Sequence, residues 1–149
     1  MPAVTAAQKP ANRSNGFTAE ERAAMRERVK EMKASTLAAE GEADVIAKIA
    51  EMPEPDRSMA GRIHTLVKEA APELTSRTWY GMPAYANADG KVVVFFQNAG
   101  KFSYRYSTLG FQDTANLDDG DVWPVSYALK KWSPAVEKKV AELVQTAIS

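Results

Sequence analysis

The chain changes character at residues 78–85, which read Thr-Trp-Tyr-Gly-Met-Pro-Ala-Tyr. Helical patterns precede this stretch, and strand patterns follow it. Gly81 accepts a positive φ without a Cβ clash, while Pro83 fixes its own φ and favours an extended conformation for Met82. We therefore expect a strand that ends in a turn flanked by three aromatic rings, at the junction of a helical half and a sheet half.

The residues before this turn predict three helices. Thr18 and Glu21 have the spacing of a capping box, and the helix that they begin extends to about residue 33. Residues 34–41 are typical of a connector, and residues 42–52 predict a second helix. Residues 55–71 predict a third helix, with the clearest apolar periodicity in the chain.

The residues after the turn predict an antiparallel sheet. Apolar runs and alternating patterns indicate about five strands, over residues 75–80, 84–87, 91–97, 101–106 and 122–129. Short connections between most of these runs favour antiparallel pairing, while residues 108–121 are irregular. Ser133 and Pro134 predict the cap and first residue of a C-terminal helix. The expected fold class is α+β, with the N-terminal helices and the C-terminal helix packed on one face of the sheet.

The length of 149 residues favours a single domain, because a chain of this size can bury a core without disulfides or metal. Residues 1–16 are rich in Ala, Asn, Ser and Pro and predict a flexible N-terminal tail. Residues 17–149 are expected to form one domain, of which residues 17–40 are a helical extension.

Composition argues against several classes of partner. Nineteen Lys and Arg balance 19 Asp and Glu, so no long-range attraction to nucleic acid or to an anionic membrane is expected. The chain has no cysteine, which excludes disulfides and thiolate chemistry and fits a reducing compartment. No apolar run approaches the roughly 20 residues that span a bilayer. We expect a cytoplasmic protein and make no prediction of its oligomeric state.

Several motifs together resemble one family of proteins. They are Met52-Pro53-Glu54-Pro55, Glu69-Ala70-Ala71-Pro72-Glu73, Tyr80-Gly81-Met82-Pro83, Gly90-Lys91, Val94-Phe95-Phe96 and Asp118-Asp119-Gly120-Asp121-Val122-Trp123-Pro124. On these residues the chain resembles the YdhG-like family of domains of unknown function, in the YjbR/frataxin-like superfamily, over about residues 42–149. The resemblance implies a YdhG/frataxin-like fold. Through one branch it also implies an iron chaperone that binds iron through surface carboxylates.

The densest group of carboxylates is the first candidate site. Carboxylate oxygens are the ligands that hard cations, including iron, prefer. The candidate metal ligands are Asp113, Asp118, Asp119 and Asp121, the last three lying within four residues beside a glycine. The spacing of an EF-hand is missing. A plain turn or helix cap is the alternative interpretation, because Asp and Gly are common loop formers.

The aromatic turn is the second candidate site. The candidate ligand-binding residues are Trp79, Tyr80, Met82, Tyr85 and Arg105. If the turn and the Arg105 face meet, rings and a cation form a rim that suits a small anionic or planar ligand, or a peptide. Alternatively, the rings fill one side of the sheet beneath the helices. Such rings also suit single-stranded bases, which the balanced charge disfavours.

Signals for catalysis are weak. His64 is the only histidine and adjoins an apolar helical stripe, so a structural or solvent-facing histidine is expected. The chain has neither a Gly-x-Ser-x-Gly nucleophile elbow nor a phosphate-binding loop. Three functions stay open. They are a frataxin-like iron-binding protein, a small-molecule or peptide-binding module that uses the turn at residues 79–85 and, ranked last, an enzyme of unassigned chemistry.

Overall fold

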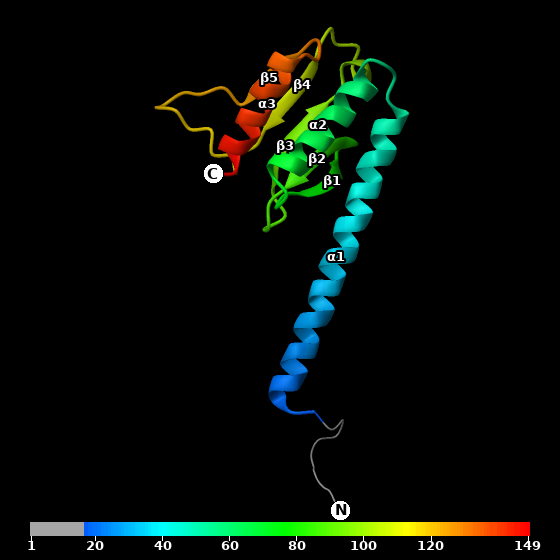
Figure 1. Cartoon of the computed structure of the whole chain (residues 1–149), viewed down its shortest axis with the longest axis vertical. Helices are drawn as coiled ribbons and strands as arrows, with labels where there is room; N and C mark the ends of the chain where they lie inside the picture. The colour runs from blue at the N-terminus through cyan, green and yellow to red at the C-terminus, as the bar shows by residue number, and fades with distance from the viewer. Residues whose placement is uncertain (1–16) are drawn as a thin grey trace, which may run out of the picture. The chain divides into compact units, whose positions relative to one another are not determined.

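The structure is a computed structural model that describes residues 17–149, so the tail predicted over residues 1–16 lies outside it (Figure 1). Contacts divide the chain after Leu37 into two units. The described part of the first unit is helical, and residues 38–149 hold the sheet and the core. Each unit is described by itself.

Helix α1 (Ala19–Glu51) begins in the first unit with the predicted capping box. The Thr18 amide donates to Glu21 Oε1 at 2.9 Å, and the Glu21 amide donates to Thr18 Oγ1 at 3.0 Å. The apolar stripe on this half of the helix is exposed at Met25, Val29 and Met32.

The connector predicted over residues 34–41 is wrong, because α1 continues through it. This stretch is rich in Ala, the strongest helix former, so its local preference agrees with a helix. Gly41 suggests a break in the sequence, but it serves packing. A Cβ at this position would collide with the carbonyl oxygen of Ser76, so glycine lets the helix approach the sheet backbone.

The sheet is an antiparallel meander with the strand order β1-β2-β3-β4-β5. Its strands are β1 (Thr75–Trp79), β2 (Met82–Ala86), β3 (Val92–Gln97), β4 (Ser107–Phe111) and β5 (Ser126–Leu129). Together with three helices they confirm the predicted α+β class and five-stranded antiparallel sheet.

The fourth strand was predicted in the wrong place. Residues 101–106 alternate polar and aromatic residues as a half-buried strand would, yet they form turns after a short 3-10 helix (Ala99–Lys101). Ser103 has a φ of 58°, which interrupts an extended backbone. The strand lies over the next five residues, where buried Leu109 and Phe111 face the core.

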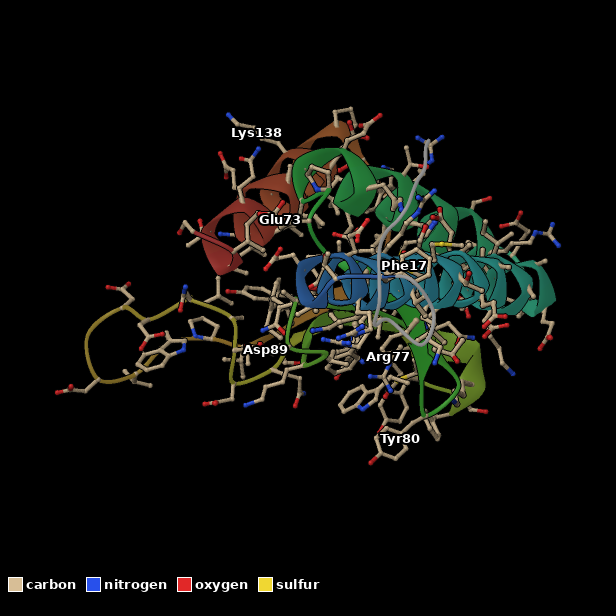
Figure 2. All side chains as sticks on the ribbon, turned by 90° about the horizontal axis from the view of Figure 1, so that it is seen from below. Phe17, Glu73, Arg77, Tyr80, Asp89 and Lys138 are labelled. Atoms are coloured by element: carbon tan, nitrogen blue, oxygen red, sulfur yellow. The ribbon has the colours of Figure 1, made fainter. Side chains whose placement is uncertain are left out.

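Helices α2 (Asp56–Ala70) and α3 (Pro134–Ala147) pack on one face of the sheet, which we call the covered face. Its core includes Val67 from α2 and Val144 from α3, with Phe96 from β3. We call the opposite side the open face. Figure 2 shows Arg77 of β1 on this side, away from Lys138 on α3.

Helix α3 begins as predicted, since the Ser133 side chain accepts a hydrogen bond from the Val136 amide at 3.2 Å and Pro134 follows the cap. Within residues 17–149, no helix combines the length and the apolar character that crossing a bilayer requires.

Candidate functional site

The turn between β1 and β2 is tight and outward-facing. Tyr80 has a φ of 51° and Gly81 a φ of 75°, so the chain reverses within two residues. The ring of Tyr80 is 79% exposed and packs edge-on against Trp79, with centroids 4.9 Å apart. Lys101 Nζ donates to the carbonyl oxygen of Tyr80 at 2.7 Å and ties the turn to the connection between β3 and β4.

Tyr85 has a different environment from the rest of the turn. It is only 1% exposed on the covered face, and its hydroxyl lies 2.9 Å from His64 Nδ1. The other ring nitrogen, Nε2, lies 3.1 Å from Glu42 Oε2, and Lys68 Nζ donates to Glu42 Oε1 at 2.8 Å. Tyr85 therefore offers no surface to an external ligand, and both ring nitrogens of His64 have partners within the fold.

The contacts among Tyr85, His64, Glu42 and Lys68 shift two pKa values and determine where a neutral His64 carries its proton. Burial raises the pKa of Tyr85 far above its usual range, and the Glu42 charge adds to the effect. The hydrogen bond from Lys68, followed by that from His64, lowers the pKa of Glu42. An ionised Glu42 only accepts hydrogen bonds, so a neutral His64 carries its proton on Nε2 and accepts the Tyr85 hydroxyl at Nδ1.

A groove of about 330 Å³ opens at the sheet and combines a ring with cations. We call it the open-face groove. It is lined by Arg77, Trp79, Gly90, Lys91, Val92, Gln112, Asp113 and Thr114. Residues from β1, from the β2–β3 hairpin and from the segment after β4 therefore meet in one hollow.

Strand geometry explains why these side chains share the groove. Arg77 and Trp79 are two apart on β1, so both point to the same face. Arg77 pairs in register with Ala84, and Val92 of β3 pairs with Ala86. The Trp79 ring packs against the Phe95 ring, with centroids 5.2 Å apart.

The hairpin between β2 and β3 contacts one cation of the groove and carries the other. Arg77 Nη1 donates to the Gly90 carbonyl oxygen at 3.3 Å. The Lys91 amide donates to the Asn87 side-chain oxygen at 3.0 Å, which fixes the hairpin from which its side chain extends. In the described part of the chain, neither cation lies within 4.0 Å of a carboxylate. Asp113 is the one acidic side chain in the lining.

The structure separates the candidate ligand-binding residues into three environments, of which the first is the buried position of Tyr85 on the covered face. Trp79 lines the open-face groove, and Met82 is its buried register partner on β2. Tyr80 and Arg105 lie at the end of the sheet where β1, β3 and β5 finish. Arg105 stacks on Tyr106, with its guanidinium carbon 5.3 Å from the ring centroid.

The candidate metal ligands do not come together. Asp118, Asp119 and Asp121 are exposed in the loop between β4 and β5, whereas Asp113 lines the groove. Within residues 17–149, no group of three or more His, Cys, Asp or Glu side chains is placed to hold a metal ion.

A larger hollow of about 480 Å³ lies on the helices. Its charged lining consists of Arg62, Glu69 and Glu137, and it contains no aromatic ring. Two carboxylates against one cation disfavour an anion, and the hollow has no ring for a planar group. The open-face groove is therefore the better candidate site despite its smaller volume.

Sequence reasoning missed Arg77, Lys91 and Gln112. A signal for Arg77 was present, because it lies two residues before Trp79 on a predicted strand and must share its face. Lys91 directly follows Asp89-Gly90, a dipeptide typical of hairpin turns. No local pattern marks Gln112, which reaches the groove only because β4 lies at residues 107–111.

Comparison of the chain with protein-family models, with curated proteins and with solved structures finds no match in any of the three.

Proposed function

We propose that this chain is a binding protein for a planar aromatic carboxylate, which it holds in the open-face groove. The observation that carries this proposal is the placement of Arg77 and Lys91 beside Trp79 without a carboxylate partner in the described residues. The proposal keeps Trp79 from the aromatic turn that the sequence predicted as a ligand site, and it specifies an aromatic carboxylate as the ligand.

Charge supports an anion. A guanidinium presents a fork of N–H donors that matches a carboxylate, and a lysine adds a point charge. Arg77 uses Nη1 on the Gly90 carbonyl at a long 3.3 Å, so the rest of its fork is available. Asp113 offsets one of the two positive charges, which leaves the lining with a net positive charge.

Shape supports a planar group. Trp79 is braced by Phe95 at 5.2 Å and by Tyr80 at 4.9 Å, so its ring is fixed before a ligand arrives. A preorganised ring costs little conformational entropy on binding. The volume of about 330 Å³ lies at the small end of the range for ligand pockets, about 300–1,000 Å³.

The test uses three probes that separate charge from shape. Naphthoate carries a ring and a carboxylate, naphthamide keeps the shape without the charge, and acetate keeps the charge without the ring. Isothermal titration calorimetry should rank naphthoate above both others. Arg77→Ala should weaken naphthoate binding about tenfold or more, since a charged hydrogen-bonding partner is worth about 1.5–3 kcal/mol.

Arg62→Ala is the matched control, because it removes an equal charge from an exposed position in the helical hollow. It should leave naphthoate binding unchanged. Equal affinity for naphthoate and naphthamide, or equal losses in both arginine variants, would contradict the proposal.

Iron delivery, which the YdhG-like resemblance implies, stays a prediction that rests on sequence motifs. Its proposed ligands are Asp113, Asp118, Asp119 and Asp121. We favour the carboxylate-binding function because the groove gathers its residues, whereas the candidate iron ligands are divided between the groove and a loop.

A further inference from the structure

We propose that the end of the sheet beside the Tyr80 turn is a binding surface for single-stranded nucleic acid. We call this surface the aromatic end, and it consists of Tyr80, residues 101–106, Lys130 and Lys131. None of these residues lines the open-face groove, although Tyr80 packs against Trp79, and the partner belongs to a different class.

Exposed rings are the first observation. Phe102 and Tyr104 are each 54% exposed and lie next to one another, with centroids 6.1 Å apart. Tyr104 in turn contacts Tyr106, with centroids 6.2 Å apart. A contiguous patch of exposed rings commonly marks an interaction site. Three successive rings give stacking surfaces to successive bases of an extended strand.

The cations of this surface are the second observation. Lys101 Nζ lies 5.7 Å from the Phe102 centroid, and the Arg105 guanidinium lies over Tyr106. Lys130 follows Leu129, the register partner of Ser107, so it lies at the same end of the sheet as Tyr106. Together with Lys131, the next residue, four cations therefore lie at this end of the sheet. Among the described residues, none of the four forms an ion pair.

The net charge of zero hides an uneven distribution of basic and acidic residues along the second half of the chain. Residues 90–112 and 122–132 contain no Asp or Glu, whereas residues 113–121 contain four Asp and no Lys or Arg. Strand β4 runs from the aromatic end to this acidic loop, so these four Asp lie at the opposite end of the sheet. The carboxylates near the aromatic end are the buried Asp56, which accepts from the Gly100 amide, and Glu51, which lines one hollow with Lys101. The balanced net charge of the whole chain therefore does not disfavour nucleic acid at the aromatic end.

The loop of the aromatic end is held in place, which favours binding. The Gly100 amide donates to the buried Asp56 carboxylate at 2.8 Å, and the Ala99 amide donates to Ser107 Oγ at 2.9 Å. The Tyr104 amide donates to the Ala99 carbonyl at 2.9 Å. A surface fixed in this way loses little entropy when it binds.

A polyanion with flat bases fits this surface better than a lipid bilayer does. Residues 101–106 read Lys-Phe-Ser-Tyr-Arg-Tyr and contain no aliphatic side chain to enter hydrocarbon. Stacking requires accessible base faces, which a single strand provides and a duplex does not.

The experiment measures fluorescence anisotropy of a labelled oligodeoxythymidylate of about 12 nucleotides, within the usual site size of about 4–16. Wild-type chain should bind it, and Tyr104→Ala should weaken binding about tenfold or more. If four cations contact phosphates, the slope of log affinity against log salt should be about −3. Replacing Lys130 and Lys131 by Ala should reduce that slope by about 1.4.

Each control variant makes a comparable substitution at a position outside the aromatic end. Replacing Lys138 and Lys139 on α3 by Ala alters the net charge equally and should leave affinity and slope unchanged. Val122→Ala shortens an exposed apolar side chain outside the surface and should also have no effect. Arg77→Ala should leave oligonucleotide binding intact, which separates this proposal from the carboxylate site.

Four results would overturn the proposal. They are no binding by the wild-type chain, equal binding of duplex and single strand, equal losses in the two lysine double variants, and binding to phosphatidylserine vesicles in place of the oligonucleotide. Every variant alters an exposed side chain, so circular dichroism should confirm an unchanged fold.

Discussion

The hydroxyl of Tyr85 lies 2.9 Å from Nδ1 of His64, although 21 positions separate the two residues along the chain. This contact joins β2 to α2, and Glu42 extends it to α1 through His64 Nε2. The most buried ring of the turn motif is therefore committed to structure, while its neighbours Trp79 and Tyr80 remain accessible. The same short motif supplies both an anchor and a binding surface.

Tyr85→Phe should destabilise the protein by about 1–2 kcal/mol. The ring remains, but His64 Nδ1 loses its partner in a part-buried position. The free energy of unfolding from urea denaturation checks this value. Tyr80→Phe is the control, because that side chain is 79% exposed and should change stability by less than about 0.5 kcal/mol. Equal effects of the two substitutions would refute the structural role of the contact.

Alkaline pH should destabilise the fold through Tyr85. Because burial raises its pKa in the folded state, the unfolded chain releases this proton first as pH rises. The stabilisation is therefore present below the usual pKa of 10.0 and is lost progressively above it. Urea denaturation should show a steeper alkaline decline in the wild type than in Tyr85→Phe. Parallel declines would mean that Tyr85 does not contribute.

Acid pH should act through Glu42, in the opposite direction. Its pKa is lowered in the fold, so its stabilisation is present above the usual value of 4.5 and is lost as pH falls below it. Glu42→Gln should destabilise the protein near neutral pH by about 1 kcal/mol or less, since solvent screens this side chain. The difference between variant and wild type should shrink towards acid pH. A constant difference would argue against the charge as the cause.

Two helical glycines should respond oppositely to alanine. Gly41→Ala should cost about 1–3 kcal/mol, because its Cβ would meet the Ser76 carbonyl, a backbone atom that cannot move aside easily. Gly61→Ala should stabilise the protein by up to about 1 kcal/mol, because no atom lies within 4 Å of its Cβ position on α2. Thermal unfolding distinguishes the two. Stabilisation by both would contradict the close approach of α1 to β1.

Local chemistry explains which parts of the fold could be predicted from the sequence. The capping box at Thr18 and the cap at Ser133 depend on residues within one turn, and both were predicted correctly. The fourth strand was not, because the alternation of residues 101–106 mimics a strand. These residues depart from an extended conformation because Lys101 lies in the 3-10 helix, Phe102 has a ψ of 15° and Ser103 has a φ of 58°. Their residue types do not signal these backbone angles.

The candidate site was predictable in part. Trp79 could be singled out because large rings beside a Gly-Pro turn are recognisable locally. The groove itself depends on strand register, which brings Asp113 and Lys91 near Trp79 across intervening strands. The burial of Tyr85 depends on its contact with a helix 21 positions away, which no local pattern encodes.

The binding of naphthoate by Asp113→Asn tests the proposed function most directly, because Asp113 has opposite roles in the two candidate functions. As an acidic side chain in a cationic groove it opposes an anion, so its removal should tighten naphthoate binding about two- to fivefold, or roughly 0.5–1 kcal/mol. As an iron ligand it should be required for ferrous iron binding under anaerobic conditions. Tighter naphthoate binding is the result that we predict. Unchanged or weaker naphthoate binding, together with loss of iron binding, would contradict the proposed function.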